Sequence, residues 1–233
     1  MQVLGIIPAR GGSKGIPRKN IARLAGRPLL AYTAEAALGS RGLTRIILST
    51  DDLEIATVGR GEGLEVPFLR PPDLARDDSL AIDVVRHVLA ELAATESYEP
   101  DAVMLLQPTS PLRRAEHIDA AIDLLQASQA DSVVSVVPVP HHFNPISLMK
   151  LADGKLTPCA PGVPITLRQE KPLVFARNGP AILLTRTRFI QEENRFYGNH
   201  CQPLVMRTQD SVDIDDPADL EYAEYLLLRR VAA

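Results

Sequence analysis

Short apolar runs rich in β-branched residues recur along the chain, at Val3 to Ile7, Arg45 to Ser49, Ala102 to Leu106 and Ser132 to Val137. Their length and their lack of polar alternation predict buried parallel strands. Between them lie segments with apolar side chains at helical spacing, at 28–39, 79–95 and 115–128. This alternation predicts an α/β fold with a doubly wound, mostly parallel sheet, in which ligands bind at the carboxyl ends of the strands.

The pattern changes at residue 138, within the sequence VPVPHHFNP. From there to residue 177 the chain is rich in proline and has weak periodicity. We therefore expect a core of residues 1–137 and 178–233, interrupted by an excursion at 138–177. Apolar runs return at Ala181 to Leu184 and at Leu204 to Met206, and a last helix is expected to start at Asp216-Pro217, with Asp216 as its cap.

Composition narrows the class of protein. The chain has 233 residues, enough for one sizeable domain, and a net charge of −4, so no global positive field favours nucleic acid or an anionic membrane. No apolar stretch approaches the ~18 residues of a membrane span. Cys159 and Cys201 are far apart, which argues against a disulfide scaffold or a zinc cluster. These features predict a soluble cytoplasmic protein with no nucleic-acid or membrane partner.

The loop after the first strand carries the clearest chemical signal. A glycine pair, Gly11 and Gly12, lies among four basic residues, at positions 10, 14, 18 and 19. Glycine-turned backbone can point N–H groups at an anion while cations neutralise it, so the loop suits phosphates. Its spacing fits neither GxxxxGK[ST] nor GxGxxG. A basic, solvated turn is the alternative, but this density of charge in one strand-to-helix loop favours an anion site.

The loop IPARGGSKGIPRKN resembles the signature loop of acylneuraminate cytidylyltransferases, also called CMP-sialic acid synthetases. Further blocks resemble that family in order: STDD (49–52), RPPDLARDDS (70–79), LLQPTSPLR (105–113), NG (178–179) and SVDIDDPADLEYAE (211–224). The resemblance implies a Rossmann-like nucleotidyltransferase fold. It also implies transfer of CMP from CTP to the anomeric hydroxyl of a 2-keto sugar acid, with release of pyrophosphate.

Candidate residues follow from the loop and from the resemblance together. Arg10 and Lys19 are the catalytic candidates, because cations there would neutralise charge on the α-phosphate and the leaving pyrophosphate. The resemblance places Asn20 and Arg70 beside the nucleotide. The complete set of candidates for nucleotide binding is Ala9, Arg10, Gly11, Gly12, Ser13, Lys14, Asn20, Arg70 and Ser79.

Two carboxylates near the C-terminus are the candidates for a metal site. Asp213 and Asp215 are two residues apart, so in an extended segment both project to one face, where hard oxygen ligands can share Mg²⁺. The alternative is that this acidic run only caps the last helix, which we expect of Asp216. The resemblance implies the same metal assignment for Asp213 and Asp215.

The acceptor side is predicted from strand position and resemblance. Gln107 follows a buried strand at the edge where a substrate should lie. The alternative is that Thr109 or Ser110 caps the next helix and Gln107 is only a polar residue at the end of the strand. Arg168 has the guanidinium to pair with a sugar-acid carboxylate. The acceptor candidates are Gln107, Arg168, Gln169 and Asn178. The resemblance also implies that the excursion reaches a second subunit, which predicts a homodimer.

Some features depart from the family pattern, at Pro180, at Leu183 or Leu184, and after the His141-His142 pair. All of them lie on the acceptor side, so another nonulosonic acid, a deoxy sugar acid or a phosphonate stays open as the acceptor. A nucleotidyltransferase that uses a sugar phosphate and a non-catalytic nucleotide-binding regulator are the alternative functions. The adjacent histidines are expected to mark a hinge rather than a metal site.

Overall fold

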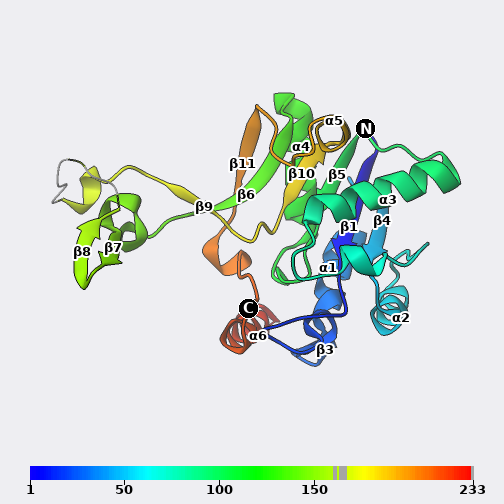
Figure 1. The fold of residues 1–233 in the computed structure, drawn as a ribbon, viewed down its shortest axis with the longest axis horizontal. Helices are drawn as coiled ribbons and strands as arrows, with labels where there is room; N and C mark the ends of the chain where they lie inside the picture. The colour runs from blue at the N-terminus through cyan, green and yellow to red at the C-terminus, as the bar shows by residue number, and fades with distance from the viewer. Residues whose placement is uncertain (160–161, 163–166, 232–233) are drawn as a thin grey trace.

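The computed structural model describes residues 1–159, 162 and 167–231, and its centre is one mixed sheet (Figure 1). In order across the sheet its strands are β11 (Cys201–Val205), β6 (Ser132–Pro138), β10 (Leu183–Arg186), β5 (Ala102–Leu105), β1 (Val3–Pro8) and β4 (Arg45–Ser49). Only β10 on this path runs antiparallel to its neighbours, and a short strand, β9 (Phe175–Arg177), pairs with the end of β6. The predicted doubly wound, mostly parallel sheet is confirmed.

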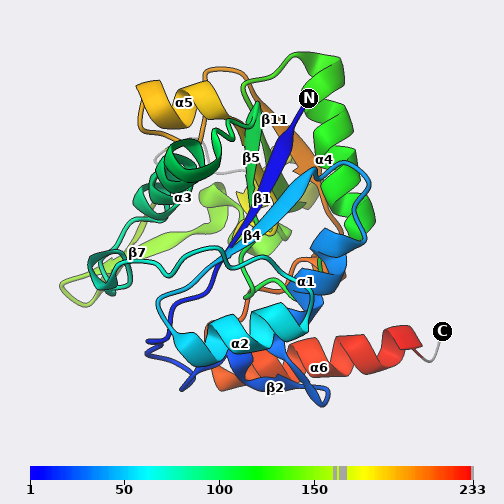
Figure 2. The ribbon, with the colours of Figure 1, turned by 90° about the vertical axis from the view of Figure 1, so that its right-hand side faces the viewer.

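Helices cover both faces of the sheet, as Figure 2 shows. On one face, α1 (Leu29–Leu38), α2 (Leu53–Gly61) and α4 (Ala115–Ser128) share an apolar core with the sheet. On the other, α3 (Ala81–Glu96) and α5 (Thr187–Glu192) pack on a second core. Because successive side chains of a strand point to opposite faces, β1 supplies Ile7 to the first core and Ile6 to the second.

The predicted elements agree closely with the observed ones in the first half of the chain. The strand at Arg45 to Ser49 and the helix at 115–128 have the predicted bounds, and the other strands there differ by one residue. The helix expected at 79–95 begins later, at Ala81, because Ser79 bonds within the preceding loop. The apolar run Ala181 to Leu184 overlaps the start of β10, and Ala181 and Ile182 are buried just before its ladder. The run Leu204 to Met206 overlaps the end of β11.

The excursion forms an arm, residues 139–174, that projects from the core (Figure 1). Its tip contains a two-stranded hairpin of β7 (Met149–Ala152) and β8 (Lys155–Pro158), whose residues are all exposed. Short 3₁₀ turns lie along it at His141–Phe143, Pro145–Ser147 and Arg168–Glu170. The arm is anchored to the sheet where β9 pairs with Val136 to Pro138 of β6.

The last helix, α6 (Pro217–Val231), lies beneath the carboxyl edge of the sheet, beside the small hairpin of β2 (Arg23–Leu24) and β3 (Arg27–Pro28). Asp216 Oδ1 accepts from the Asp219 N–H at 3.0 Å, so Asp216 caps this helix as predicted. A third apolar cluster joins Ile214 and Ala223 to Ile16, Leu24 and Leu29. Burial of Ile214 therefore fixes the acidic segment 213–215 against the glycine loop, residues 9–20. The other 3₁₀ turns are Lys19–Ile21, Pro72–Leu74 and Thr208–Asp210.

Candidate active site

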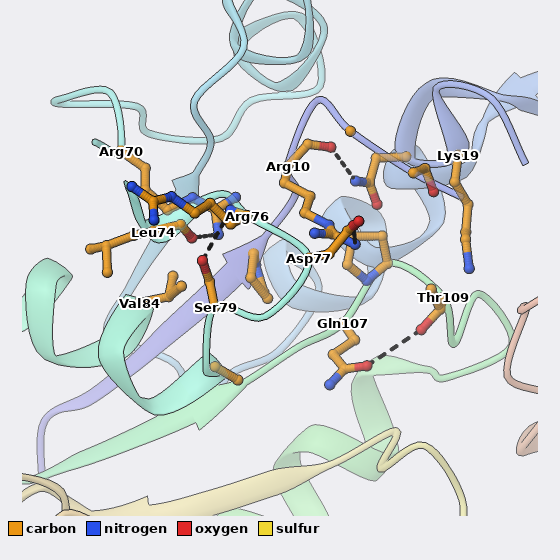
Figure 3. A pocket seen from close by; sticks show the side chains of 16 residues that line it. Arg10, Lys19, Arg70, Leu74, Arg76, Asp77, Ser79, Val84, Gln107 and Thr109 are labelled. Carbon is orange, nitrogen blue, oxygen red and sulfur yellow. Dashed lines mark hydrogen bonds and ion pairs between the residues drawn. The ribbon is translucent and has the colours of Figure 1, made fainter. Parts of the chain in front are cut away.

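A cleft of about 310 Å³ opens at the carboxyl edge of β1 and β5. Three loops form its walls: the glycine loop, residues 70–79, and residues 107–109. In Figure 3, Arg70 and Ser79 lie at one end and Lys19 and Thr109 at the other, with Arg10 between them. The sequence predicted this edge, because the loops that follow neighbouring parallel strands meet there.

The backbone of the glycine loop is held by side chains from two directions. The Gly11 N–H donates to Asp51 Oδ1 at 3.0 Å, and a Cβ added to Gly11 would lie 2.8 Å from Asp52 Oδ2. Asn20 Nδ2 donates to the Arg10 carbonyl at 2.9 Å. Glycine is thus needed at position 11 for close approach of a carboxylate, and its N–H is used within the protein. Ala9 is fully buried behind the loop, whereas Gly12 and Ser13 line the cleft.

The four cations of the glycine loop pair with carboxylates from three separate segments of the chain. Arg10 Nη2 and Lys14 Nζ each lie 2.9 Å from an oxygen of Asp77, whose pKa they lower, Lys14 most. Arg18 forms a two-point ion pair with Asp52 at 2.6 and 3.0 Å, which lowers the pKa of that carboxyl. Arg18 is therefore committed to holding the loop in shape. The cations that face the cleft or its rim are the other three.

Lys19 links the glycine loop to the acidic segment from the far end of the chain. Its Nζ donates to the Ile214 carbonyl at 2.8 Å and lies 3.6 Å from Asp215 Oδ1. The backbones also meet, because a Cβ on Gly15 would lie 2.4 Å from the Asp215 carbonyl oxygen. The structure therefore brings the cationic loop and the two candidate metal ligands to the same edge of the sheet.

Asp213 and Asp215 have the properties expected of ligands for a hard cation. Asp213 Oδ1 is buried without a hydrogen-bond partner, and burial raises the pKa of this carboxyl, while a hydrogen bond from Thr109 opposes the rise. Asp215 has 84% of its side chain exposed. Among the described residues, no group of three or more His, Cys, Asp or Glu side chains is placed to hold a metal ion. Two carboxylates with phosphate and water oxygens fit Mg²⁺, which keeps several waters and binds with substrate phosphates.

Arg70 and Ser79 lie together at the far end of the cleft (Figure 3). Arg70 is buried, and burial lowers the pKa of its guanidinium, partly offset by Asp51 at 3.7 Å. Its Nη1 donates to the Leu74 carbonyl at 3.4 Å, but Nε and Nη2 have no hydrogen-bond partner. Buried donors without partners usually signal a bound group or water. This end of the cleft can therefore recognise a polar ring or hydroxyls.

The residues predicted for the acceptor are dispersed. Gln107 lines the cleft, and the capping alternative is excluded because α4 starts at Ala115, with Arg114 as its N-cap. Asn178 is buried, does not line the cleft, and accepts from Ser135 Oγ at 2.6 Å. Gln169 lies on the arm, away from the cleft, and the side chain of Arg168 lies outside the described part of the structure.

Sequence reasoning gave no role to three carboxylates that organise the site. Asp51 and Asp52 stand in the block STDD and hold the glycine loop, and Asp77 in RPPDLARDDS bridges Arg10 and Lys14. The signal was their position in blocks that resemble the family. Their partners are 34 to 67 residues away along the chain and could not be assigned without the fold.

Comparison with known proteins gives consistent matches. The model of the family described as Cytidylyltransferase matches residues 4–232. The CMP-N,N′-diacetyllegionaminic acid synthase of Legionella pneumophila is 37% identical over 97% of both chains. The N-acylneuraminate cytidylyltransferase of Escherichia coli is 32% identical over 95% of this chain, which spans 51% of that protein.

A solved structure of a CMP:2-keto-3-deoxy-manno-octonic acid synthetase complexed with CTP has a TM-score of 0.73 over 99% of this chain and 100% of that one. At 16% identity this similarity shows only the fold, which is a Rossmann-like nucleotidyltransferase fold. In the part of the chain that the structure describes, no helix has the length and hydropathy to cross a bilayer. Since the family model and the Legionella relative both match nearly the whole sequence, the chain belongs to the cytidylyltransferase family that includes the N-acylneuraminate cytidylyltransferases.

Proposed function

We propose that the protein transfers CMP from CTP to the anomeric hydroxyl of a nonulosonic acid and releases pyrophosphate. One observation supports this most: Lys19 joins the cationic glycine loop to Asp215 at the edge of a cleft that also contains Arg10 and Gln107. The Legionella relative, named for the synthesis of CMP-N,N′-diacetyllegionaminic acid, supports the same substrate class.

In this proposal the nucleotide lies along the cleft. The unpartnered donors of Arg70, together with Ser79, would bind the cytidine, and Arg10 and Lys14 would exchange Asp77 for phosphate oxygens. Asp213 and Asp215 would hold Mg²⁺. When bound, this ion neutralises the triphosphate and stabilises the charge that develops during transfer.

In this proposal no residue of the chain forms a covalent bond to either substrate. The acceptor hydroxyl oxygen forms a bond to the α-phosphorus, the bond from that phosphorus to the β-phosphate oxygen breaks, and the hydroxyl proton passes to solvent. Arg10 and Lys19 would stabilise the negative charge on the α-phosphate and on the departing pyrophosphate. Gln107 would hydrogen-bond to hydroxyls of the acceptor.

We further propose a homodimer in which the arm of one subunit covers the acceptor pocket of the other. The arm exposes large apolar side chains, including Leu148, Met149, Leu151, Leu156 and Leu173, more than a solvated hairpin needs. Arg168 and Gln169 of the partner subunit would then approach the acceptor. Leu151→Asp, at a side chain 73% exposed, should give monomers in light scattering; Leu53→Asp on the core, 69% exposed, is the matched control. Dimers of both variants would contradict the proposed interface.

Activity is tested with purified protein, CTP, MgCl₂ and a panel of N,N′-diacetyllegionaminic acid, N-acetylneuraminic acid and 2-keto-3-deoxy-manno-octonic acid. We expect pyrophosphate release with at least one nonulosonic acid, and the CMP-sugar signal in ³¹P NMR. Thermal-shift measurements should show that CTP stabilises the protein more than ATP, GTP or UTP. Stabilisation by CTP without turnover of any acid would instead support the non-catalytic regulator.

The predicted cytoplasmic location remains a prediction, based on two cysteines that are unpaired in the structure.

A further inference from the structure

Arg113 carries a buried positive charge that the proposed chemistry does not use. Only 3% of the residue is exposed, and burial alone lowers the pKa of its guanidinium to about 9, so it stays protonated at neutral pH. Among the residues that the structure describes, it forms no ion pair with a carboxylate. Burying an unpaired charge is costly, so its hydrogen-bond acceptors must be placed to offset that cost.

Those acceptors come from three separate elements. Nη1 donates to the Ala181 carbonyl at 2.7 Å, and Nη2 donates to Thr33 Oγ1 of α1 at 2.7 Å. Both nitrogens also donate to the Gln107 carbonyl, at 3.3 and 3.2 Å. Arg113 therefore connects the loop after β5, the residue that precedes β10 by two positions, and the first helix.

The register of the sheet shows where the guanidinium of Arg113 lies. β10 pairs with β5 antiparallel, and the last ladder pair toward the cleft is Leu183 with Leu105. Two residues further, the same register places Ala181 opposite Gln107. The ladder ends before this pair, and the carbonyls of Ala181 and Gln107 both accept hydrogen bonds from Arg113. The guanidinium bridges the two carbonyls and sets their separation, because its fork of donors is planar and rigid.

We propose that Arg113 is a positioning residue for the acceptor, which fixes the peptide of Gln107 and its distance from the turn at Asn178 to Ala181. Gln107 lines the cleft, so rotation of its peptide would redirect its side chain, while Arg70, Arg10 and Lys19 are held by other contacts. The inference rests on the proposed function, since it assumes that Gln107 contacts the acceptor. Arg113 itself acts through Gln107 and need not touch substrate.

The test compares Arg113→Lys, Thr33→Val, Gln107→Ala and the double variant Arg113→Lys/Gln107→Ala, with N,N′-diacetyllegionaminic acid as the acceptor. Lysine keeps the charge and loses the fork. Valine keeps the shape of the side chain but removes the Thr33 hydroxyl, which accepts from Arg113 and donates to the Gln107 carbonyl at 3.5 Å. We expect kcat/KM for the acid to fall about tenfold in Arg113→Lys and severalfold in Thr33→Val, with KM for CTP unchanged within about twofold. The double variant should be no slower than Gln107→Ala, because residues that act as one unit are not additive.

Two results would show a purely structural role and overturn the inference. One is an equal decrease in kcat/KM for CTP and for the acid; the other is a decrease in the double variant equal to the product of the two single decreases. If Arg113→Lys shows no cooperative melting transition, Thr33→Val and Thr33→Val/Gln107→Ala decide by the same criteria. An inactive wild type refutes the proposed use of this acid and the inference with it. An active wild type with unchanged acid kinetics in folded Arg113→Lys and Thr33→Val refutes only the inference.

Discussion

Gly15→Ala tests the contact between the glycine loop and the acidic segment. A Cβ at this position would lie 2.4 Å from the carbonyl oxygen of Asp215, about 1 Å closer than the ordinary contact of 3.4 Å. The clash is with backbone on both sides, so rotation of a side chain cannot relieve it. The two segments must therefore move apart, and Lys19 must lengthen or lose its contacts with Ile214 and Asp215.

The expected magnitude follows from that displacement. Overpacking of this kind costs about 1–3 kcal/mol of stability, which lowers Tm by a few degrees in a chain of this size. Its effect on catalysis should be larger, because displacing reacting groups by about 1 Å can reduce the rate roughly 100-fold. We therefore expect a folded protein whose kcat falls far more than its stability.

The assay is steady-state pyrophosphate release over a range of MgCl₂ concentrations, with thermal melting on the same samples. Gly61→Ala is the control, because it adds the same methyl group at the end of α2, where nothing lies within 4 Å. It should keep the wild-type rate. Wild-type kcat in Gly15→Ala at all Mg²⁺ concentrations, or an equal loss in both variants, would refute a functional contact between the loop and the acidic segment.

Three further predictions concern titratable side chains at the cleft, at the start of α2 and on α4. Asp77→Asn should lower the Kd for CTP, measured by calorimetry at low salt, because two cations of the glycine loop lose a competing carboxylate; Asp78→Asn should not. Asp52→Ala should destabilise the protein by about 1 kcal/mol in urea titrations through loss of the α2 cap, and should raise KM for CTP as Arg18 is released. Burial lowers the pKa of His117 below 6.5, so the unfolded chain binds a proton that the folded protein does not, and stability falls as the pH decreases through 6.5. His117→Asn should therefore show a smaller drop in Tm between about pH 7.5 and 5.5, and an equal drop would contradict this reasoning.

Much of the core could be predicted because its signal is local. A buried strand such as Arg45–Ser49 needs an unbroken apolar run, and α4 needs apolar side chains at every third or fourth position; both signals lie within one short window. Helix α2 was not predicted, since it is only nine residues long and contains Gly59 and Gly61. Its stability comes from the Asp52 cap and from packing of Ile55 and Ala56 in the core.

The direction of β10 was beyond the reach of the sequence. An apolar run records burial, and burial is the same whether a strand is parallel or antiparallel to its neighbours. The antiparallel pairing with β5 places Ala181 opposite Gln107, where Arg113 donates to both carbonyls. The position of the arm is similar: its proline content predicted an excursion, but where it extends depends on the pairing of β6 with β9.

The sequence by itself determined the layered α/β core, the glycines and basic residues of the glycine loop and the pair of carboxylates at 213 and 215, because each depends on residue types at fixed short spacings. Only the tertiary structure decided which charged side chains are paired within the protein and which are available to bind a ligand. It pairs Arg18 with Asp52, Arg10 and Lys14 with Asp77, and leaves an oxygen of Asp213 without a partner. Charge pairing depends on distances of a few ångströms between residues far apart in the chain, and those distances are set by the packing of α6 and the sheet.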